Sequence, residues 1–249
     1  FFKERIHSIR RPRPDDFQIK EAAEKIKKSK NPIIISGGGV FYSNAMEELS
    51  NFATKHNIPV TQTVMGYSTM KRDHSHYAGQ IGGLGGKNTN DLAKETDLAI
   101  AVGTKLADFT TGSWANFENE KFKLVSVNVS RFDANKHLAQ AVVGDAKVSL
   151  IELSKALGDW KLGDEWNEKS QRELKIWNEH IDKESAPTNQ EVPSYVQVIG
   201  AIYRNSEPTD IAVTAAGGLV GEVVQVWRPK ELNTHESEWG FSCMSYEIS

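Results

Sequence analysis

Two glycine-rich turns contain the residues best suited to hold a phosphate group. Gly37, Gly38 and Gly39 follow a short apolar run and precede a helical pattern, a place where backbone N–H groups and a helix dipole can bind an anion. The pattern G-x-G-x-x-G is only two-thirds met, because Tyr42 occupies the position of the last glycine. A strand–helix turn that needs a positive φ angle explains the same residues. The second turn, residues 82–86, could wrap a phosphate or form a mobile loop over a strand edge.

Other reactive side chains give weaker signals. His74 and His76 would point the same way on an extended chain and could share a metal ion. No further Cys, His or acidic cluster accompanies them, which favours a solvated loop. Cys243 has no evident His or Asn partner, so we expect a buried structural thiol. Asp145 follows a glycine, as in the Gly-Asp-Gly element that holds a magnesium diphosphate, but no glycine comes after it. We therefore expect Asp145 to cap the next helix.

Composition excludes several classes of protein. The 249 residues carry 30 Lys and Arg against 33 Asp and Glu, a formal charge of −3, which argues against a dedicated nucleic-acid binder. No apolar run approaches the ~20 residues that a membrane-spanning helix requires. A single cysteine rules out an internal disulfide and suits a reducing, cytoplasmic compartment.

Helical and strand patterns alternate through the first two thirds of the chain. This order predicts an α/β fold, a doubly wound Rossmann-like parallel sheet with helices on both faces. A long loop is expected between residues 61 and 88. Strands are expected at 32–35, 58–60, 97–102, 123–129 and 141–143, and helices from Asp15 or Asp16, from Ser43 or Asn44, near 89–95 and over 148–157.

The pattern changes after residue 158. Residues 159–190 are charged, with three spaced tryptophans, and predict an exposed helical connector packed through those rings. A new unit then begins, with a helix over 192–204, a buried strand over 210–214, a tight turn into a helix, and a short strand near 233–238. We divide the chain into a linker (1–14), a central Rossmann-like domain (15–158), the connector (159–190) and the truncated start of a second α/β domain (191–249). The absence of an initial Met and an end inside an apolar helical pattern suggest a fragment.

Three segments resemble the central domain of thiamin diphosphate enzymes: residues 31–39, 97–108 and 143–147. Residues 109–113, 214–219, 227–230 and 238–248 are similar to a hydrolase branch of that family, which opens a cyclic 1,2-diketone in myo-inositol catabolism. The resemblance implies a magnesium- and thiamin diphosphate-dependent C–C bond hydrolase of three α/β domains. Its catalytic Glu and its metal motif would lie outside this chain, so no catalytic or metal-binding residue is expected in it, and the fragment is expected to be inactive.

The resemblance also assigns cofactor contacts in the full-length enzyme. Met244 matches the bulky residue that wedges under the cofactor, although plain core filling is the alternative. Ser242 would accept the 4′-amino group through its carbonyl, and Gly217, Gly218 and Leu219 match the turn at the diphosphate end.

Some relatives hold FAD in the central domain, and the matching positions here predict a vestigial nucleotide crevice. Lys105 stands where those relatives present Arg, which loses the planar guanidinium fork. Asn128 stands where a carboxylate usually reaches an adenosine hydroxyl. Bound FAD is therefore not expected. The matching residues are Gly38, Gly39, Thr63, Met65, Gly103, Lys105 and Asp145.

The implied partners are a small-molecule cyclic diketone and further copies of the enzyme, because relatives build active sites between subunits. Neither nucleic acid nor membrane is expected as a partner. Two alternatives remain: an acetohydroxyacid synthase-like carboligase, and a stand-alone nucleotide-binding α/β module.

Overall fold

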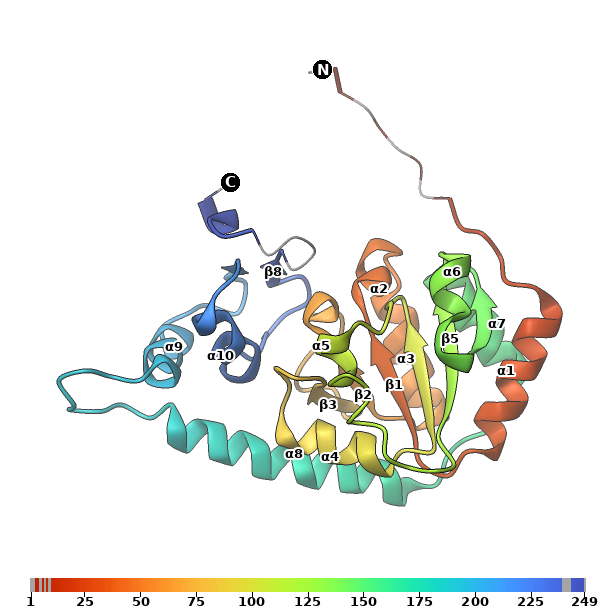
Figure 1. The fold of residues 1–249 in the computed structure, drawn as a ribbon, viewed down its shortest axis with the longest axis horizontal. Helices are drawn as coiled ribbons and strands as arrows, with labels where there is room; N and C mark the ends of the chain where they lie inside the picture. Colours follow the sequence, from red (N-terminus) through yellow and green to blue (C-terminus); the bar gives the residue numbers. More distant parts are fainter. Residues whose placement is uncertain (1–2, 5, 7, 9, 239–242, 249) are drawn as a thin grey trace.

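The computed structural model describes residues 3, 4, 6, 8, 10–238 and 243–248. Its centre is a six-stranded parallel sheet in the order β3-β2-β1-β4-β5-β6 (Figure 1). This order confirms the doubly wound α/β fold. The strands are β1 (Pro32–Ser36), β2 (Val60–Gln62), β3 (Tyr77–Gln80), β4 (Leu98–Val102), β5 (Lys123–Asn128) and β6 (Gln140–Val143).

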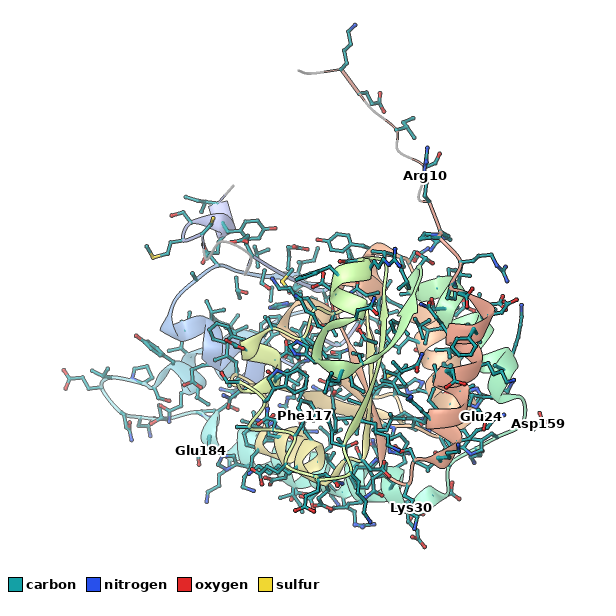
Figure 2. The ribbon with its side chains drawn as sticks, turned by 45° about the vertical axis from the view of Figure 1, so that its right-hand side comes forward. Arg10, Glu24, Lys30, Phe117, Asp159 and Glu184 are labelled. Carbon is teal, nitrogen blue, oxygen red and sulfur yellow. The ribbon has the colours of Figure 1, made fainter. Side chains whose placement is uncertain are left out.

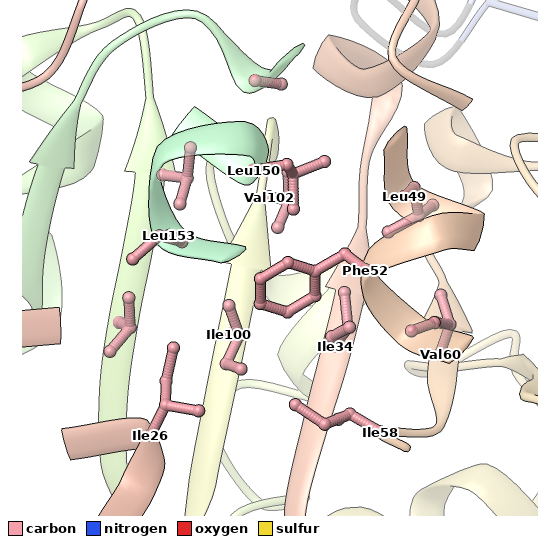
Figure 3. Packing of buried hydrophobic residues seen from close by; sticks show 14 of the residues in the cluster. Ile26, Ile34, Leu49, Phe52, Ile58, Val60, Ile100, Val102, Leu150 and Leu153 are labelled. Carbon is pink, nitrogen blue, oxygen red and sulfur yellow. The ribbon is translucent and has the colours of Figure 1, made fainter. Parts of the chain in front are cut away.

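Three helices cover one face of the sheet: α1 (Asp16–Lys28), α3 (Met46–His56) and α7 (Ala146–Leu157). Asp15, one of the two caps expected for α1, accepts a hydrogen bond from the Phe17 amide at 2.9 Å through its carboxylate. Phe52 of α3 lies over Ile34 and Ile100 at the middle of this layer (Figure 3). Full burial of such a side chain contributes about 2 kcal/mol.

The other face is covered by α4 (Lys87–Glu95) and α8 (Asp164–Glu184), which lie side by side (Figure 1). Ile33 and Ile35 of β1 point into this layer, whereas Ile34 points into the opposite one. The expected packing of the connector is confirmed at Trp166, which is buried and donates its indole N–H to the Pro32 carbonyl at 2.9 Å.

The segment expected to be one long loop contains the edge strand β3. Its four residues include Gly79, with φ +108°, and the buried Gln80, so no apolar run marks it. A one-turn helix, α2 (Gly38–Tyr42), precedes α3. Further short turns of helix are η1 (Val64–Gly66), α5 (Asp108–Thr111), α6 (Arg131–Ala134) and η2 (Lys136–Leu138).

A smaller unit follows α8 and lies beside the sheet (Figure 1). Its two strands pair in parallel, and its helices pack on Tyr67 and Ile181 from the preceding part of the chain. The strand expected to be buried is partly exposed, with 43% of Val213 accessible. No helix among the described residues is long and apolar enough to cross a membrane. The elements are α9 (Tyr195–Arg204), β7 (Ala212–Thr214), α10 (Gly218–Val226), β8 (His235–Ser237) and η3 (Tyr246–Ile248).

Candidate functional site

A crevice of about 430 Å³ lies at the carboxyl edge of the sheet. It opens beside β1 and β4, where the strand order reverses, the usual position of a ligand site in such sheets. The structure brings six of the seven predicted crevice residues together there. They are Gly38, Gly39, Thr63, Met65, Gly103 and Lys105.

Close backbone packing accounts for the glycines at this edge. The amides of Gly37 and Gly39 donate to the carbonyls of Val102 and Gly103, both at 2.9 Å. A Cβ atom on Gly39 would lie 2.6 Å from the Cα of Gly103, and one on Gly38 would lie 3.0 Å from the Met65 carbonyl oxygen. The interpretation as a turn that needs a positive φ angle is wrong, because none of its three glycines has one and Gly37 has φ −113°. Close contact with neighbouring backbone requires the glycines instead, and two of the turn's amides already bind backbone.

Polar side chains at the mouth of the crevice hold its loops together. The Asn128 amide donates to the Thr104 carbonyl at 3.1 Å, and its oxygen accepts from the Ser130 amide at 2.9 Å. Lys105 is exposed. A hydrogen bond from Lys136 is the main cause that lowers the pKa of Asp133, with a smaller contribution from Lys105. Asn128 thus bridges two loops through its own side chain.

Asp145 is the predicted crevice residue that does not line the cavity. It caps α7 as expected from the sequence, accepting from the Val148 amide at 3.2 Å. Its carboxylate also binds the guanidinium of Arg11 at 3.0 Å, and Arg11 donates to the Ser43 carbonyl at 2.6 Å. The carboxylate is therefore paired with the N-terminal segment, and Asp145 is not among the residues that line the crevice.

The second predicted cluster lies at the start of α10, outside the crevice. Gly217 has φ +148°, and no atom lies within 4 Å of a Cβ built on Gly217 or Gly218. Leu219 is 43% exposed. The amide of Ala215 donates to the Glu247 carboxylate at 3.2 Å. The turn therefore presents an open backbone at the N-terminus of a nine-residue helix, where an anionic group fits.

The residues near the end of the chain are exposed rather than packed. Met244 is 78% exposed, so it does not fill the core of this chain. Cys243 is also exposed, contrary to the expected buried thiol, and Glu238 raises its pKa further after the larger effect of desolvation. Ser242 lies outside the described residues.

The remaining candidates are structural. His76 is buried, contrary to the expected solvated loop, and lies 2.9 Å from the Asn57 amide oxygen. Burial lowers its pKa to about 4. No group of three metal-ligating side chains occurs in the part of the chain that the structure describes. In the loop at 82–86, Gly82 exchanges two hydrogen bonds with the Asn90 side chain, which pins the turn.

The model of the thiamine pyrophosphate enzyme central domain matches residues 19–153, more than half of the chain. The chain belongs to the thiamine pyrophosphate enzyme family. The match spans the sheet from α1 to α7, including every predicted crevice residue.

Three relatives are named 3D-(3,5/4)-trihydroxycyclohexane-1,2-dione hydrolase. They come from Clostridium tetani, Bacillus anthracis and Clostridium perfringens, and are 36%, 34% and 34% identical to this thiamine pyrophosphate enzyme chain. The alignments cover 100% of the chain but only 42%, 42% and 43% of the relatives. The chain thus spans less than half the length of these proteins.

Tyr67 links the two units of this family member, and sequence reasoning missed it. It follows η1, whose residues Val64 and Met65 line the crevice. Its hydroxyl donates to the Val224 carbonyl at 3.1 Å and to that of Trp227, and burial is the main cause that raises its pKa well above 10. No local signal identifies it, because both partners lie more than 150 residues away.

Proposed function

We propose that the whole protein containing this chain is a thiamin diphosphate-dependent hydrolase that opens the ring of a trihydroxycyclohexane-1,2-dione by C–C cleavage. The observation that carries the proposal is the 34–36% identity to hydrolases of that name over 100% of the chain. The second unit supports the proposal, because the open space at its glycine turn, Gly217 and Gly218, fits a diphosphate. This turn lies beyond the central-domain match, which ends at residue 153.

In this proposal the chain's own residues bind and orient the cofactor. The amides at the start of α10, from Gly217 to Leu219, would hold the diphosphate, with Mg²⁺ held by residues elsewhere in the full-length protein. Met244 would contact the cofactor, and the Ser242 carbonyl would accept a hydrogen bond from the cofactor's 4′-amino group. When bound, the cofactor supplies a nucleophilic thiazolium carbon that also acts as an electron sink.

We further propose that the crevice beside β1 and β4 binds no FAD. Lys105 offers a single ammonium where a guanidinium fork would bind phosphate in two places. The side-chain amide of Asn128 already hydrogen-bonds to the backbone of Thr104 and Ser130. The proposal also includes the division of the chain into a linker, a central domain, a connector and the start of a second domain, with boundaries after residues 14, 158 and 190. It further includes a cytoplasmic location, which suits the single cysteine, and assembly of the full-length enzyme into homo-oligomers.

The test uses the full-length protein, the cyclic dione and pyruvate as a competing substrate. We expect proton release from the dione that requires both thiamin diphosphate and Mg²⁺, and no acetohydroxyacid formed from pyruvate. Carboligation of pyruvate without dione hydrolysis would show an acetohydroxyacid synthase-like enzyme instead. Dione hydrolysis that persists after complete removal of thiamin diphosphate would also contradict the proposal.

A further inference from the structure

Helix α10 is held by the sheet unit along one side. Gly221, Val224 and Trp227 recur at every third position, and residues at this spacing are neighbours on a helix surface. Leu84 packs against the first of them, and Tyr67 hydrogen-bonds to the other two. Leu84 follows β3 and Tyr67 follows β2, so both contacts come from the carboxyl edge of the sheet.

Leu84 is the single bulky residue of the glycine-rich loop at 82–86. Its Cδ2 atom lies so close to Gly221 that a Cβ built on this glycine would be only 3.3 Å away. Glycine at position 221 therefore lets the leucine reach the backbone of α10, and a larger residue there would push the loop and the helix apart. The contact lies in the N-terminal half of the helix, just after the turn at 217–219.

The loop that carries Leu84 is fixed through its glycines. A Cβ on Gly82 would overlap the Phe109 carbonyl oxygen, and the Gly83 amide donates to that oxygen at 2.8 Å. The Asn90 side chain accepts from the amide of Gly82 at 3.0 Å and donates to its carbonyl at 2.9 Å. Because these backbone groups are already bonded, the loop presents Leu84 to α10 from a rigid base.

Helix α8 joins the two contacts. A Cβ on Gly86, at the end of the loop, would lie 2.9 Å from Nε1 of Trp177 in α8. Trp177 also packs against the apolar cluster that contains Tyr67. Glu184, the last residue of α8, lies beside the smaller unit, whereas Asp159 lies at the opposite side of the sheet unit (Figure 2). The helix therefore extends along both units and supports both sets of contacts.

Tyr67 holds the other end of α10. The last carbonyls of a helix have no partner within it, and the buried Tyr67 hydroxyl shares its proton between the carbonyls of Val224, at 3.1 Å, and Trp227. The Tyr67 ring also lies 4.5 Å from the ring of His235 in β8, measured between centroids. Because the two contacts lie toward opposite ends of α10, a tilt of the helix that keeps one of them breaks the other.

We propose that Leu84 and Tyr67 are positioning residues for the diphosphate turn at 217–219. This role rests on the proposed function. No side-chain hydrogen bond caps the start of α10, and no described atom lies within 4 Å of a Cβ built on Gly217 or Gly218. The place of the turn's amides therefore depends on what holds the helix behind them, and a small displacement of such groups has a large effect. The sheet unit thus takes part in cofactor binding without touching the cofactor.

The first test measures thiamin diphosphate binding to the full-length protein by isothermal titration calorimetry. Leu84→Ala removes the packing against Gly221, so we expect the dissociation constant to rise about tenfold. The matched control is Leu162→Ala, which truncates another half-buried leucine, packed in the layer under α4 and α8. It should change the constant less than about twofold. Equal changes in both variants, or none in Leu84→Ala, would overturn the positioning role.

A double variant separates the position of the helix from general stability. Gly221→Val adds about as many carbon atoms as Leu84→Ala removes, on the opposite side of the same contact. We expect each single variant to weaken binding about tenfold, and the combination to bind within about threefold of the unchanged protein. Losses that simply add in the double variant would contradict the contact as the cause.

The last test needs no cofactor. Hydrogen–deuterium exchange of the full-length protein without thiamin diphosphate follows the amides of residues 218–227. We expect Leu84→Ala and Tyr67→Phe to speed their exchange about fivefold, and Leu162→Ala to leave it unchanged. Unchanged exchange in the first two variants would overturn the inference. An unaltered protein that binds no thiamin diphosphate would refute the proposed function itself, whereas one whose binding survives Leu84→Ala would refute the positioning role alone.

Discussion

Two strand–helix turns in this molecule share one sequence pattern and have opposite surroundings. After β1, a Cβ on Gly39 would meet the backbone of Gly103 at 2.6 Å. After β7, a Cβ on Gly218 would meet nothing within 4 Å. The first turn uses glycine so that two backbones can touch, whereas the second has open space around its glycines. Glycine at the start of a helix is therefore ambiguous until its neighbours are known.

The largest expected effect comes from adding a methyl group to the packed turn after β1. Gly39→Ala forces apart the turn after β1 and the end of β4, because neither backbone can yield as a flexible side chain would. We expect the free energy of unfolding to fall by about 3 kcal/mol, measured by urea denaturation. The matched control is Gly218→Ala, which adds the same methyl group in open space and should change stability by less than about 1 kcal/mol. Equal losses would remove the distinction between the turns.

In a third turn, between β6 and α7, a side chain rather than a backbone contact holds the chain in place. Asp145 caps α7 and binds Arg11, and its side chain is only 3% exposed. Arg11→Ala leaves this carboxylate without its counter-charge, so we expect a loss of about 2 kcal/mol in the free energy of unfolding. Arg13→Ala breaks the exposed pair with Glu152 and should cost less than about 0.5 kcal/mol. Similar losses for both variants would contradict a special role for Arg11.

The open turn can be tested for binding in the full-length protein. If the proposed function holds, Gly218→Ala weakens thiamin diphosphate binding about tenfold, or ~1.4 kcal/mol, because the added methyl group occupies space beside the diphosphate. Isothermal titration calorimetry measures this directly. The isolated 249-residue chain should show no useful affinity, and tight binding to it would refute the predicted division of the site.

A smaller effect concerns the pH dependence of stability, through the buried side chain of His76. Burial lowers the pKa of His76 to about 4 from an ordinary 6.5, so the unfolded chain binds more protons between these values. Its contribution to stability is complete above pH 6.5 and is lost as the pH falls toward 4. We expect stability to decrease by on the order of 1 kcal/mol between pH 7 and pH 5 through this group. His76→Gln should flatten that part of the profile, and an unchanged slope would contradict the prediction.

The sequence predicted the parts of the fold that local patterns specify. Apolar β-branched runs identified β1 and β4. Asp145 was identified as a cap from its type and place, and Asp15 was one of two candidate caps for the first helix. Strand β3 was missed because its burial depends on polar contacts, such as the hydrogen bond from Gln80 to Gln62 at 3.1 Å. Such contacts leave no hydrophobic period in the sequence.

The candidate site was predicted less completely, and mostly through resemblance. Patterns in the residues gave a phosphate-binding turn or a positive-φ turn after β1. Neither interpretation predicted the close contact between Gly39 and the backbone of Gly103, which is a tertiary contact. The resemblance placed Asp145 in the crevice, whereas its type and place predicted the helix cap that the structure shows. Its partner Arg11, 134 residues earlier, could not be foreseen. Tyr67 was overlooked for the same physical reason, since its role arises from tertiary contacts alone.

The turn that carries Tyr67 has a consequence for movement. Thr63 accepts a hydrogen bond from the Gly66 amide at 3.0 Å, and Thr69 donates to the Gly66 carbonyl at 2.6 Å, so the segment from the crevice wall to the Tyr67 ring is stiff. A rotation of the smaller unit against the sheet must either break the bonds of the Tyr67 hydroxyl or drag Met65 with it. The shape of the crevice is therefore coupled to the orientation of α10. A fluorescent probe attached beside the crevice would change its signal when α10 moves.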